Sequence, residues 1–157
     1  MKLLVISDSH KADNTVEDII CRHPDIKHIF FLGDNTADIE NLEFLYDDKN
    51  FYIVSGNCDY ICEYSLYGIE KISGHNIFYT HGHTYCVKEG LSQLSGVAQN
   101  CGCDIVLYGH THISDITYKD GMYFVNPGSC RKSRNGINSY AVIEICEKGV
   151  IPSIIPI

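Results

Sequence analysis

Residues 2–10, KLLVISDSH, join four consecutive apolar side chains directly to polar ones, among them Asp8 and His10. A short apolar run bounded by polar residues is typical of a strand that is buried on both faces of a parallel sheet. We therefore expect a strand over residues 2–7. Because ligands bind α/β sheets at the carboxyl ends of their strands, Asp8 and His10 are candidate site residues.

Similar apolar runs recur through the first third of the chain, and they alternate with segments whose apolar residues have helical spacing. Asp13 or Asn14 is the expected N-cap of the first helix. This strand–helix alternation indicates a mainly parallel, buried sheet. The predicted elements are strands over 28–32 and 51–55 and helices over 13–21 and 37–46, the second helix with Ile39, Leu42 and Leu45 on one face.

After residue 60 the pattern changes to paired strands joined by turns, which predicts antiparallel hairpins. The chain as a whole predicts an α/β (α+β) fold in a single domain over residues 1–157, with two mixed sheets packed face to face and helices outside. The expected hairpins are 64–72 with 77–80, 113–118 with 122–125, and 139–146 with 150–154; a strand over 104–108 and a helix over 87–100, closed at Cys101 and Gly102, complete the prediction.

Composition limits the class of protein. The 157 residues are 45% hydrophobic and 20% charged, which is typical of a compact globular domain. Twelve Lys and Arg against 20 Asp and Glu give a net charge of −8, which argues against extended nucleic-acid binding through phosphates. No apolar run approaches the roughly 20 residues of a membrane span. The first apolar stretch meets Asp8 too early for a signal peptide, so we expect a soluble, cytoplasmic protein.

Eight cysteines are scattered along the chain without a Cys-x-x-Cys pair. The pair formed by Cys101 and Cys103 is too tightly spaced for the usual zinc knuckle. We expect most of the cysteines to be small buried residues in a reducing compartment rather than a disulfide framework.

Polar side chains that can bind metals follow five of the predicted strands. Taken singly, each group is weak evidence, because Gly-Asp and Gly-Asn pairs are common in turns and histidines are common on surfaces. Their repetition at strand ends is the informative feature, since parallel strands bring these ends together. The residues are Asp8, His10, Asp34, Asn57, His81, His110 and His112.

Two carboxylates, one amide oxygen and four imidazoles suit Mn²⁺, Fe, Zn²⁺ or Ni²⁺ better than Ca²⁺. Seven ligands are too many for one ion but suit two ions about 3.5–4 Å apart that share a bridging carboxylate. Glycines at 33, 56, 82 and 109 adjoin these residues. They permit close backbone approach, or they are ordinary turn glycines.

The order of these motifs, Asp-x-His, Gly-Asp, Gly-Asn-Cys-Asp, His and Gly-His-x-His over residues 8–112, resembles the calcineurin-like metallophosphoesterase superfamily. Residues 126–129, NPGS, with Arg134 behind them, resemble a motif of its small single-domain phosphodiesterase branch. That branch also contains the retromer scaffold subunit. The resemblance implies a two-sheet β-sandwich flanked by helices.

The resemblance also implies a site and a reaction. Two divalent ions, Mn²⁺ first and Ni²⁺, Zn²⁺ or Fe as alternatives, would support hydrolysis of a small phosphodiester by a metal-bridging hydroxide. Asp34, Asn57 and His81 would be the metal-supported catalytic residues. The implied ligands are Asp8, His10, Asp34 and His112 for the first ion and Asp34, Asn57, His81 and His110 for the second, with Asp34 bridging.

Cys58 departs from the wider superfamily, which often has a histidine there to protonate the leaving group. A thiol with a pKa near 8.5 is a poor acid for that step, so weak activity on monoesters with poor leaving groups is expected. His83 is a substitute donor or a surface histidine. Arg134 and Arg131, with Lys132, are candidate contacts for the second phosphate substituent or belong to a solvated loop.

A second hypothesis is a non-catalytic protein-interaction scaffold of the same fold. Its candidate surface is the apolar segment that contains Tyr60, Ile61, Tyr64, Leu66 and Tyr67. A complete set of seven metal-binding residues favours the enzyme. A nuclease on long chains is disfavoured, because no extended basic groove is visible in the sequence. A homo-oligomer is compatible with the sequence.

Overall fold

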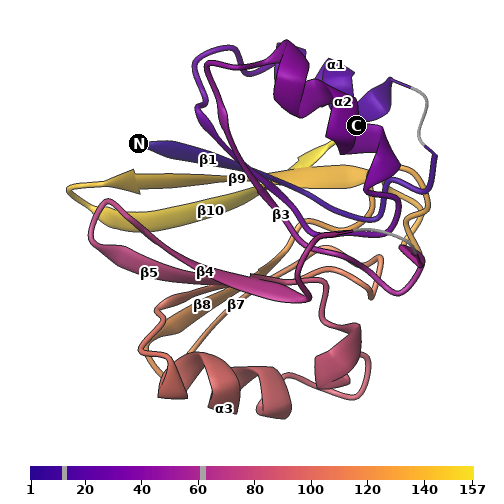
Figure 1. Ribbon diagram of the computed structural model, residues 1–157. Helices are drawn as coiled ribbons and strands as arrows, with labels where there is room; N and C mark the ends of the chain where they lie inside the picture. Colours follow the sequence, from indigo (N-terminus) through magenta and orange to yellow (C-terminus); the bar gives the residue numbers. More distant parts are fainter. Residues whose placement is uncertain (12–13, 61–62) are drawn as a thin grey trace.

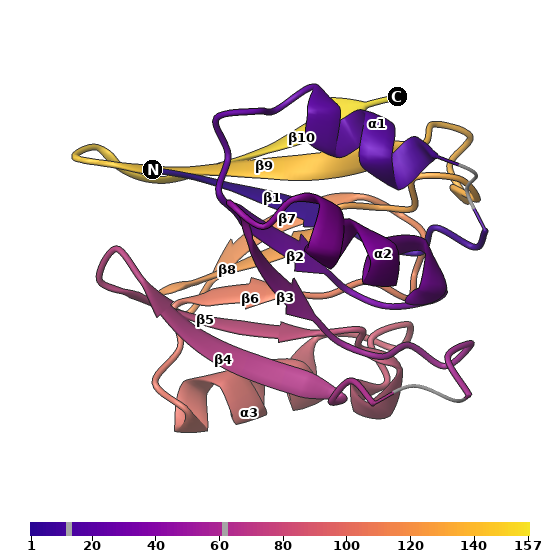
Figure 2. The same ribbon diagram turned by 45° about the horizontal axis from the view of Figure 1, so that its top comes forward.

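The computed structural model describes residues 1–11, 14–60 and 63–157. Two five-stranded sheets lie face to face, with helices on the outer sides (Figure 1; Figure 2). The order of the first sheet is β10 (Gly149–Pro156), β9 (Ser139–Cys146), β1 (Lys2–Ile6), β2 (His28–Phe31) and β3 (Asn50–Ile53). Strands β1, β2 and β3 are parallel, and β9 runs antiparallel to both β1 and β10.

The order of the second sheet is β4 (Tyr67–Ile72), β5 (His75–Thr80), β6 (Ile105–Leu107), β8 (Met122–Asn126) and β7 (Asp115–Lys119). Its centre, β5, β6 and β8, is parallel, with antiparallel strands β4 and β7 at the edges. The three predicted hairpins are therefore present, as β4–β5, β7–β8 and β9–β10. The predicted architecture of two mixed sheets flanked by helices is confirmed.

The alternation of side chains along β1 shows how the layers are built. Leu3 and Val5 face the second sheet, where they join the core between the sheets. Leu4 and Ile6 face α1 (Thr15–Cys21) and α2 (Ala37–Leu45) on the opposite side. Because both faces are covered, every residue of the run 3–6 is fully buried. No helix among the described residues is long and apolar enough to cross a membrane.

The helix that covers the second sheet is shorter than predicted. We expected it over 87–100, but α3 spans Ser92–Asn100, and the short 3₁₀ helix η1 spans His83–Tyr85. Gly82, Cys86 and Gly90 have φ values of 102°, 51° and 136°. These left-handed positions interrupt a right-handed helix, so a longer helix cannot form here.

Two details of the first helices also differ from the prediction. Asn14 is the N-cap residue of α1, but with a φ of 59° its side chain makes no capping hydrogen bond; Asp13 lies outside the described residues. Leu45 is 62% exposed instead of facing the core. The helix ends at this residue, and Tyr46 packs against the core beneath α1 and α2 in its place.

The cysteines are less buried than expected. All seven described ones are free thiols, but only Cys103 and Cys130 are buried. The others lie at helix ends, in turns or at a strand end, where the backbone is near solvent. These exposed cysteines are Cys21, Cys58, Cys86, Cys101 and Cys146; Cys62 lies outside the described residues.

Candidate metal centre

The carboxyl ends of the parallel strands from both sheets meet at one side of the molecule, where the loops gather (Figure 2). All seven predicted metal-binding residues lie at these ends. Asp8 and His10 follow β1, Asp34 follows β2, Asn57 follows β3, His81 follows β5, and His110 and His112 follow β6. Residues up to 104 positions apart in the sequence are thereby brought into contact.

The first group of side chains is centred on Asp8 and His112. One potential ligand atom from each of Asp8, His10, Asp34 and His112 lies within 4.8 Å of every other. His112 Nε2 is 3.1 Å from Asp8 Oδ1 and 3.2 Å from His10 Nε2. His10 Nε2 is also 3.6 Å from Asp34 Oδ2. The two carboxylates are almost fully buried.

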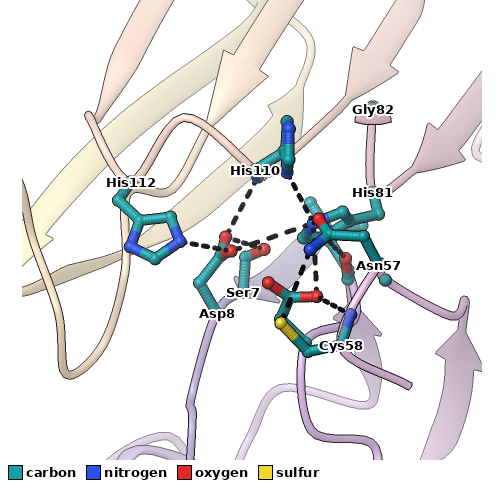
Figure 3. A network of polar contacts seen from close by, with 12 residues as sticks. Ser7, Asp8, Asn57, Cys58, His81, Gly82, His110 and His112 are labelled. Atoms are coloured by element: carbon teal, nitrogen blue, oxygen red, sulfur yellow. Dashed lines mark hydrogen bonds and ion pairs between the residues drawn. The ribbon is translucent and has the colours of Figure 1, made fainter. Parts of the chain in front are cut away.

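The second group is centred on His81 (Figure 3). Its Nε2 atom is 3.2 Å from Asn57 Oδ1 and 3.2 Å from His110 Nδ1. The same nitrogen is 3.5 Å from Asp34 Oδ1. Oδ1 of Asp34 therefore faces the second group while its Oδ2 faces the first.

Backbone carbonyls orient two of these imidazoles. His81 Nδ1 donates to the Leu32 carbonyl at 2.7 Å, and His112 Nδ1 donates to the Lys132 carbonyl at 2.9 Å. In each neutral ring the proton is therefore on Nδ1, and Nε2 presents an electron pair to the centre. Hydrogen bonding of the outer nitrogen is the usual arrangement for a metal-binding histidine.

The centre holds more electron-pair donors than its hydrogens can satisfy. Asp8 Oδ2 accepts hydrogen bonds from the Ser7 hydroxyl at 2.6 Å and the His110 amide at 3.1 Å. Asp8 Oδ1 is buried but receives no aligned hydrogen bond. His112 Nε2 is the nitrogen 3.1 Å from this oxygen. Burying a carboxylate oxygen without an aligned hydrogen bond is costly, and a bound cation would remove that cost. The residues present therefore fit divalent metal ions.

The backbone is strained where these side chains are held. The φ values of Asp8, His10, Asp34, His110 and His112 are 56°, 47°, 60°, 67° and 60°. A left-handed conformation costs a residue other than glycine about 1–3 kcal/mol, and such residues concentrate at functional sites. Five of the seven predicted metal-binding residues share this feature, so the surrounding fold holds them in place against local preference.

Two of the adjoining glycines are required for close packing. A Cβ on Gly109 would lie 2.1 Å from Ser7 Oγ and 2.8 Å from Asp8 Oδ2. A Cβ on Gly56 would lie 2.3 Å from Asp34 Oδ1. Any other residue at these two positions would displace a carboxylate of the centre.

Asp59 positions two of the loops, a role that the sequence analysis missed. Its carboxylate accepts hydrogen bonds from the amides of Asp34, Asn35, Thr36 and Gly56 at 2.7–2.9 Å. The loops after β2 and β3 are thus tied together next to Asp34 and Asn57. The only signal in the sequence was an acidic residue two positions after Asn57.

The NPGS motif, residues 126–129, also ties two loops of the centre together. The Ser129 hydroxyl donates to the Asp8 carbonyl at 2.7 Å, and Asn126 Nδ2 donates to the Gly109 carbonyl at 2.9 Å. Both side chains are fully buried. They join the loops that carry Asp8 and His110.

Burial and charge set the protonation of the centre. Burial lowers the pKa of His110 to about 4 and also lowers the pKa of His10. The polar contact with Asp8 raises the pKa of His112. Burial alone would raise the pKa of Asp8, but His112 and His81 hold it below its ordinary value. His110 is therefore neutral near pH 7, whereas His112 retains a proton more readily.

Cys58 and His83 lie beside the centre. The Cys58 amide donates to Asp34 Oδ1 at 2.9 Å. Although the residue is exposed, partial desolvation of its thiol and the charge of Asp34 raise the pKa of the thiol to about 11. The His83 ring is 5.3 Å from the ring of His81 and 6.1 Å from that of His110, between ring centroids. His83 is half-buried, so it is a neighbour of the centre and not merely a surface histidine.

The loop of residues 131–134, which contains Arg131, Lys132 and Arg134, lies against the first group. The Lys132 carbonyl holds His112, and the Arg134 amide donates to the His112 carbonyl at 3.0 Å. Both arginines are exposed, and the Arg131 guanidinium donates to the Lys11 carbonyl. The loop therefore borders the centre, with its cationic side chains at the surface.

Comparison with known proteins gives the family. Residues 1–148 match the model of the calcineurin-like phosphoesterase superfamily domain. A probable metallophosphoesterase of Bacillus subtilis, YsnB, is 28% identical over 147 residues, which cover 92% of this chain and 85% of the relative. Vacuolar protein sorting-associated protein 29 of Schizosaccharomyces pombe is 30% identical over 132 residues, covering 83% and 67%.

A solved structure agrees with both. The crystal structure of a predicted phosphoesterase from Streptococcus pneumoniae matches with a TM-score of 0.86 and 26% identity. The match covers 99% of this chain and 88% of that one. The chain therefore belongs to the calcineurin-like phosphoesterase superfamily.

Proposed function

We propose that the protein is a phosphodiesterase that depends on two divalent metal ions and hydrolyses small phosphodiesters. The observation that carries this proposal is the placement of the Asp34 carboxylate. Its Oδ2 faces His10 at 3.6 Å and its Oδ1 faces His81 at 3.5 Å, each within a separate group of electron-pair donors. A carboxylate shared between two donor groups is the arrangement that a two-metal site requires.

Each ion would be held by nitrogen and oxygen atoms only. This donor set suits Mn²⁺ first, with Ni²⁺, Zn²⁺ or Fe as alternatives. The Cys58 thiol, with its raised pKa, remains protonated and outside the set. The first ion would take Asp8, His10, Asp34 and His112, and the second Asp34, Asn57, His81 and His110.

When bound, the two ions would lower the pKa of water and neutralise charge on a phosphoryl group. Two buried carboxylates, Asp8 and Asp34, face the four positive charges of such a pair, so the loaded centre would attract an anionic diester. The exposed Arg131 and Arg134 border the His112 side, where they can contact the second substituent. Cys58, with a thiol pKa of about 11, is too weak an acid to assist a poor leaving group, so aryl esters should react best.

The test is the variant Asp34→Asn, assayed after metal reconstitution with bis(p-nitrophenyl) phosphate. Loss of the shared carboxylate should reduce the rate at least about 100-fold and lower the metal content of the protein. Asp47→Asn, at an exposed position, is the matched control and should behave as wild type. A wild-type rate in Asp34→Asn would contradict the proposal.

A second candidate function is the non-catalytic scaffold. Tyr60, Leu66 and Tyr67 are 90%, 48% and 51% exposed, which supports an interaction surface. The Tyr64 hydroxyl, in contrast, donates to Glu43 at 2.9 Å, and Ile61 lies outside the described residues. Purified protein without metal and without diesterase activity would favour the scaffold, whereas metal-dependent turnover would exclude a purely structural role.

A further inference from the structure

A hollow lies between the start of β4 and the 3₁₀ helix η1. Its volume is about 560 Å³, and it is lined by Ser65, Leu66, Tyr67, Thr84 and Tyr85. Two tyrosine rings and a leucine supply apolar surface, and Ser65, Thr84 and the two tyrosines supply hydroxyls. We refer to these five residues as the aromatic pocket.

The rings of both tyrosines pack against one buried residue, Phe78. Tyr67 stacks on Phe78, with ring centroids 5.5 Å apart and an interplanar angle of 8°. Tyr85 meets the same ring edge-on, at 5.9 Å and 74°. Phe78 is fully buried, yet Tyr67 remains 51% exposed. The pocket thus presents a fixed aromatic surface to solvent, which is the form of surface on which planar rings stack.

Short connections join the aromatic pocket to the metal centre. The Ser65 carbonyl accepts from the Ser55 amide at 2.9 Å, and Ser55 precedes Asn57 by two residues, about 7 Å of extended chain. The Leu66 carbonyl accepts from the Thr80 hydroxyl at 2.8 Å, and Thr80 directly precedes His81.

The opposite wall has a similar connection. Thr84 follows His83, whose ring centroid is 5.3 Å from that of His81. Both walls of the pocket are therefore anchored within a few residues of the second group of the centre.

We propose that the aromatic pocket is a substrate subsite that binds a planar, uncharged aromatic substituent of the diester, the chemical class to which nucleobases belong. This inference rests on the proposed function. None of the lining side chains is charged, which disfavours an anionic group there. The cationic side chains of Lys132 and Arg134 act on His10 and His112 of the first group. Lys88 acts on His110 of the second group but does not line the pocket. The diester then lies across the centre, with its aromatic substituent on the His81 side.

Binding of a product-like probe tests this subsite without requiring turnover. The probe is adenosine 5′-monophosphate and the comparator is ribose 5-phosphate, both titrated against zinc-loaded protein and followed by NMR. Wild type should bind the adenosine compound about tenfold more tightly, since stacking contributes about 1–3 kcal/mol per base. Tyr67→Ala should abolish this preference, and Tyr67→Phe should retain it.

Tyr118→Ala is the matched control, because Tyr118 is also an exposed strand tyrosine, 63% accessible, in contact with another ring, that of Tyr123. It should keep the preference. If Tyr67→Ala does not fold, as judged by circular dichroism, Tyr85→Ala serves the same purpose. Equal binding of the two probes by wild type, or a preference that survives in Tyr67→Ala, would contradict the proposed subsite. Either result would favour a protein-binding role for this surface.

The experiments distinguish failure of the aromatic subsite from failure of the proposed phosphodiesterase activity. Diester hydrolysis without an adenosine preference removes the aromatic pocket from the reaction but keeps the phosphodiesterase. A preference that depends on Tyr67 in a protein without turnover keeps the pocket and removes the enzyme.

Discussion

His81 Nε2 and Asn57 Oδ1 lie 3.2 Å apart, and both atoms carry electron pairs with which they can bind a cation. The proton of the His81 ring is on Nδ1, where the Leu32 carbonyl accepts it at 2.7 Å. Asp34 Oδ1 is a third electron-pair donor, 3.5 Å from the same nitrogen. A cation among these atoms converts their mutual repulsion into coordination.

Substitution of Asn57 should therefore remove one ion and not both. Asn57→Ala deletes an oxygen of the second group but leaves Asp8, His10 and His112 intact. We expect the metal content, measured by mass spectrometry after dialysis, to fall from two ions per chain to about one. Asn41→Ala, on the exposed side of α2, should keep both ions. Full occupancy in Asn57→Ala would show that the amide is not a ligand.

Asp59 should act on metal binding through the backbone. Asp59→Ala leaves four amides without their acceptor, so the free energy of unfolding should fall by about 2–3 kcal/mol, and metal affinity should fall with it. Asp59→Asn keeps one acceptor oxygen and should lose less. Urea denaturation and metal titration of both variants measure the two effects. Unchanged metal affinity in a destabilised Asp59→Ala would limit the role of Asp59 to folding.

Metal affinity should increase as the pH rises. His112 has a raised pKa in the metal-free protein, so a proton must leave its ring before Nε2 can bind an ion. His110, with a pKa of about 4, is already neutral above pH 5 and adds no dependence there. Calorimetric titrations with Zn²⁺ should give tighter binding and less proton release at pH 8 than at pH 6. His75→Gln, far from the centre, should show the same trend, and a pH-independent affinity would refute this account.

A matched pair of glycine variants tests the packing of the centre. A methyl group on Gly109 would lie 2.1 Å from Ser7 Oγ, whereas one on Gly96 meets nothing within 4 Å. Gly109→Ala should cost about 1–3 kcal/mol of stability, as overpacking does. Gly96→Ala, inside α3, should stabilise the protein by about 0.5–1 kcal/mol. Thermal and urea unfolding of the two variants should therefore shift in opposite directions.

Replacing Cys58 should widen the range of leaving groups. An imidazole at this position titrates near neutral pH, unlike the present thiol with its pKa of about 11. Cys58→His should increase hydrolysis of alkyl esters about 10- to 100-fold, within the range of general acid catalysis. Aryl esters need no such acid, so their rate should change little. Cys86→His, at another exposed cysteine, controls for a non-specific effect. An equal gain on both ester types would argue against leaving-group protonation.

Much of the fold was predictable because its signals are local. The fully buried run 3–6 and the three hairpins depend on apolar periodicity and turn residues within short segments. The start of α3 was not predictable in the same way, because residues 87–91 have helical spacing but contain Gly90, whose φ of 136° interrupts a right-handed helix. The exposure of Leu45 also depends on where α2 ends above the sheet.

The sequence by itself determined which side chains stand at the strand ends, since each of these polar residues comes shortly after an apolar run in the chain. Only the tertiary structure decided how they meet. Packing of the two sheets directs one oxygen of Asp34 to His10 and the other to His81, and it directs the Asp59 carboxylate to amides on two loops. These contacts join residues that are distant in sequence, so no local pattern encodes their geometry.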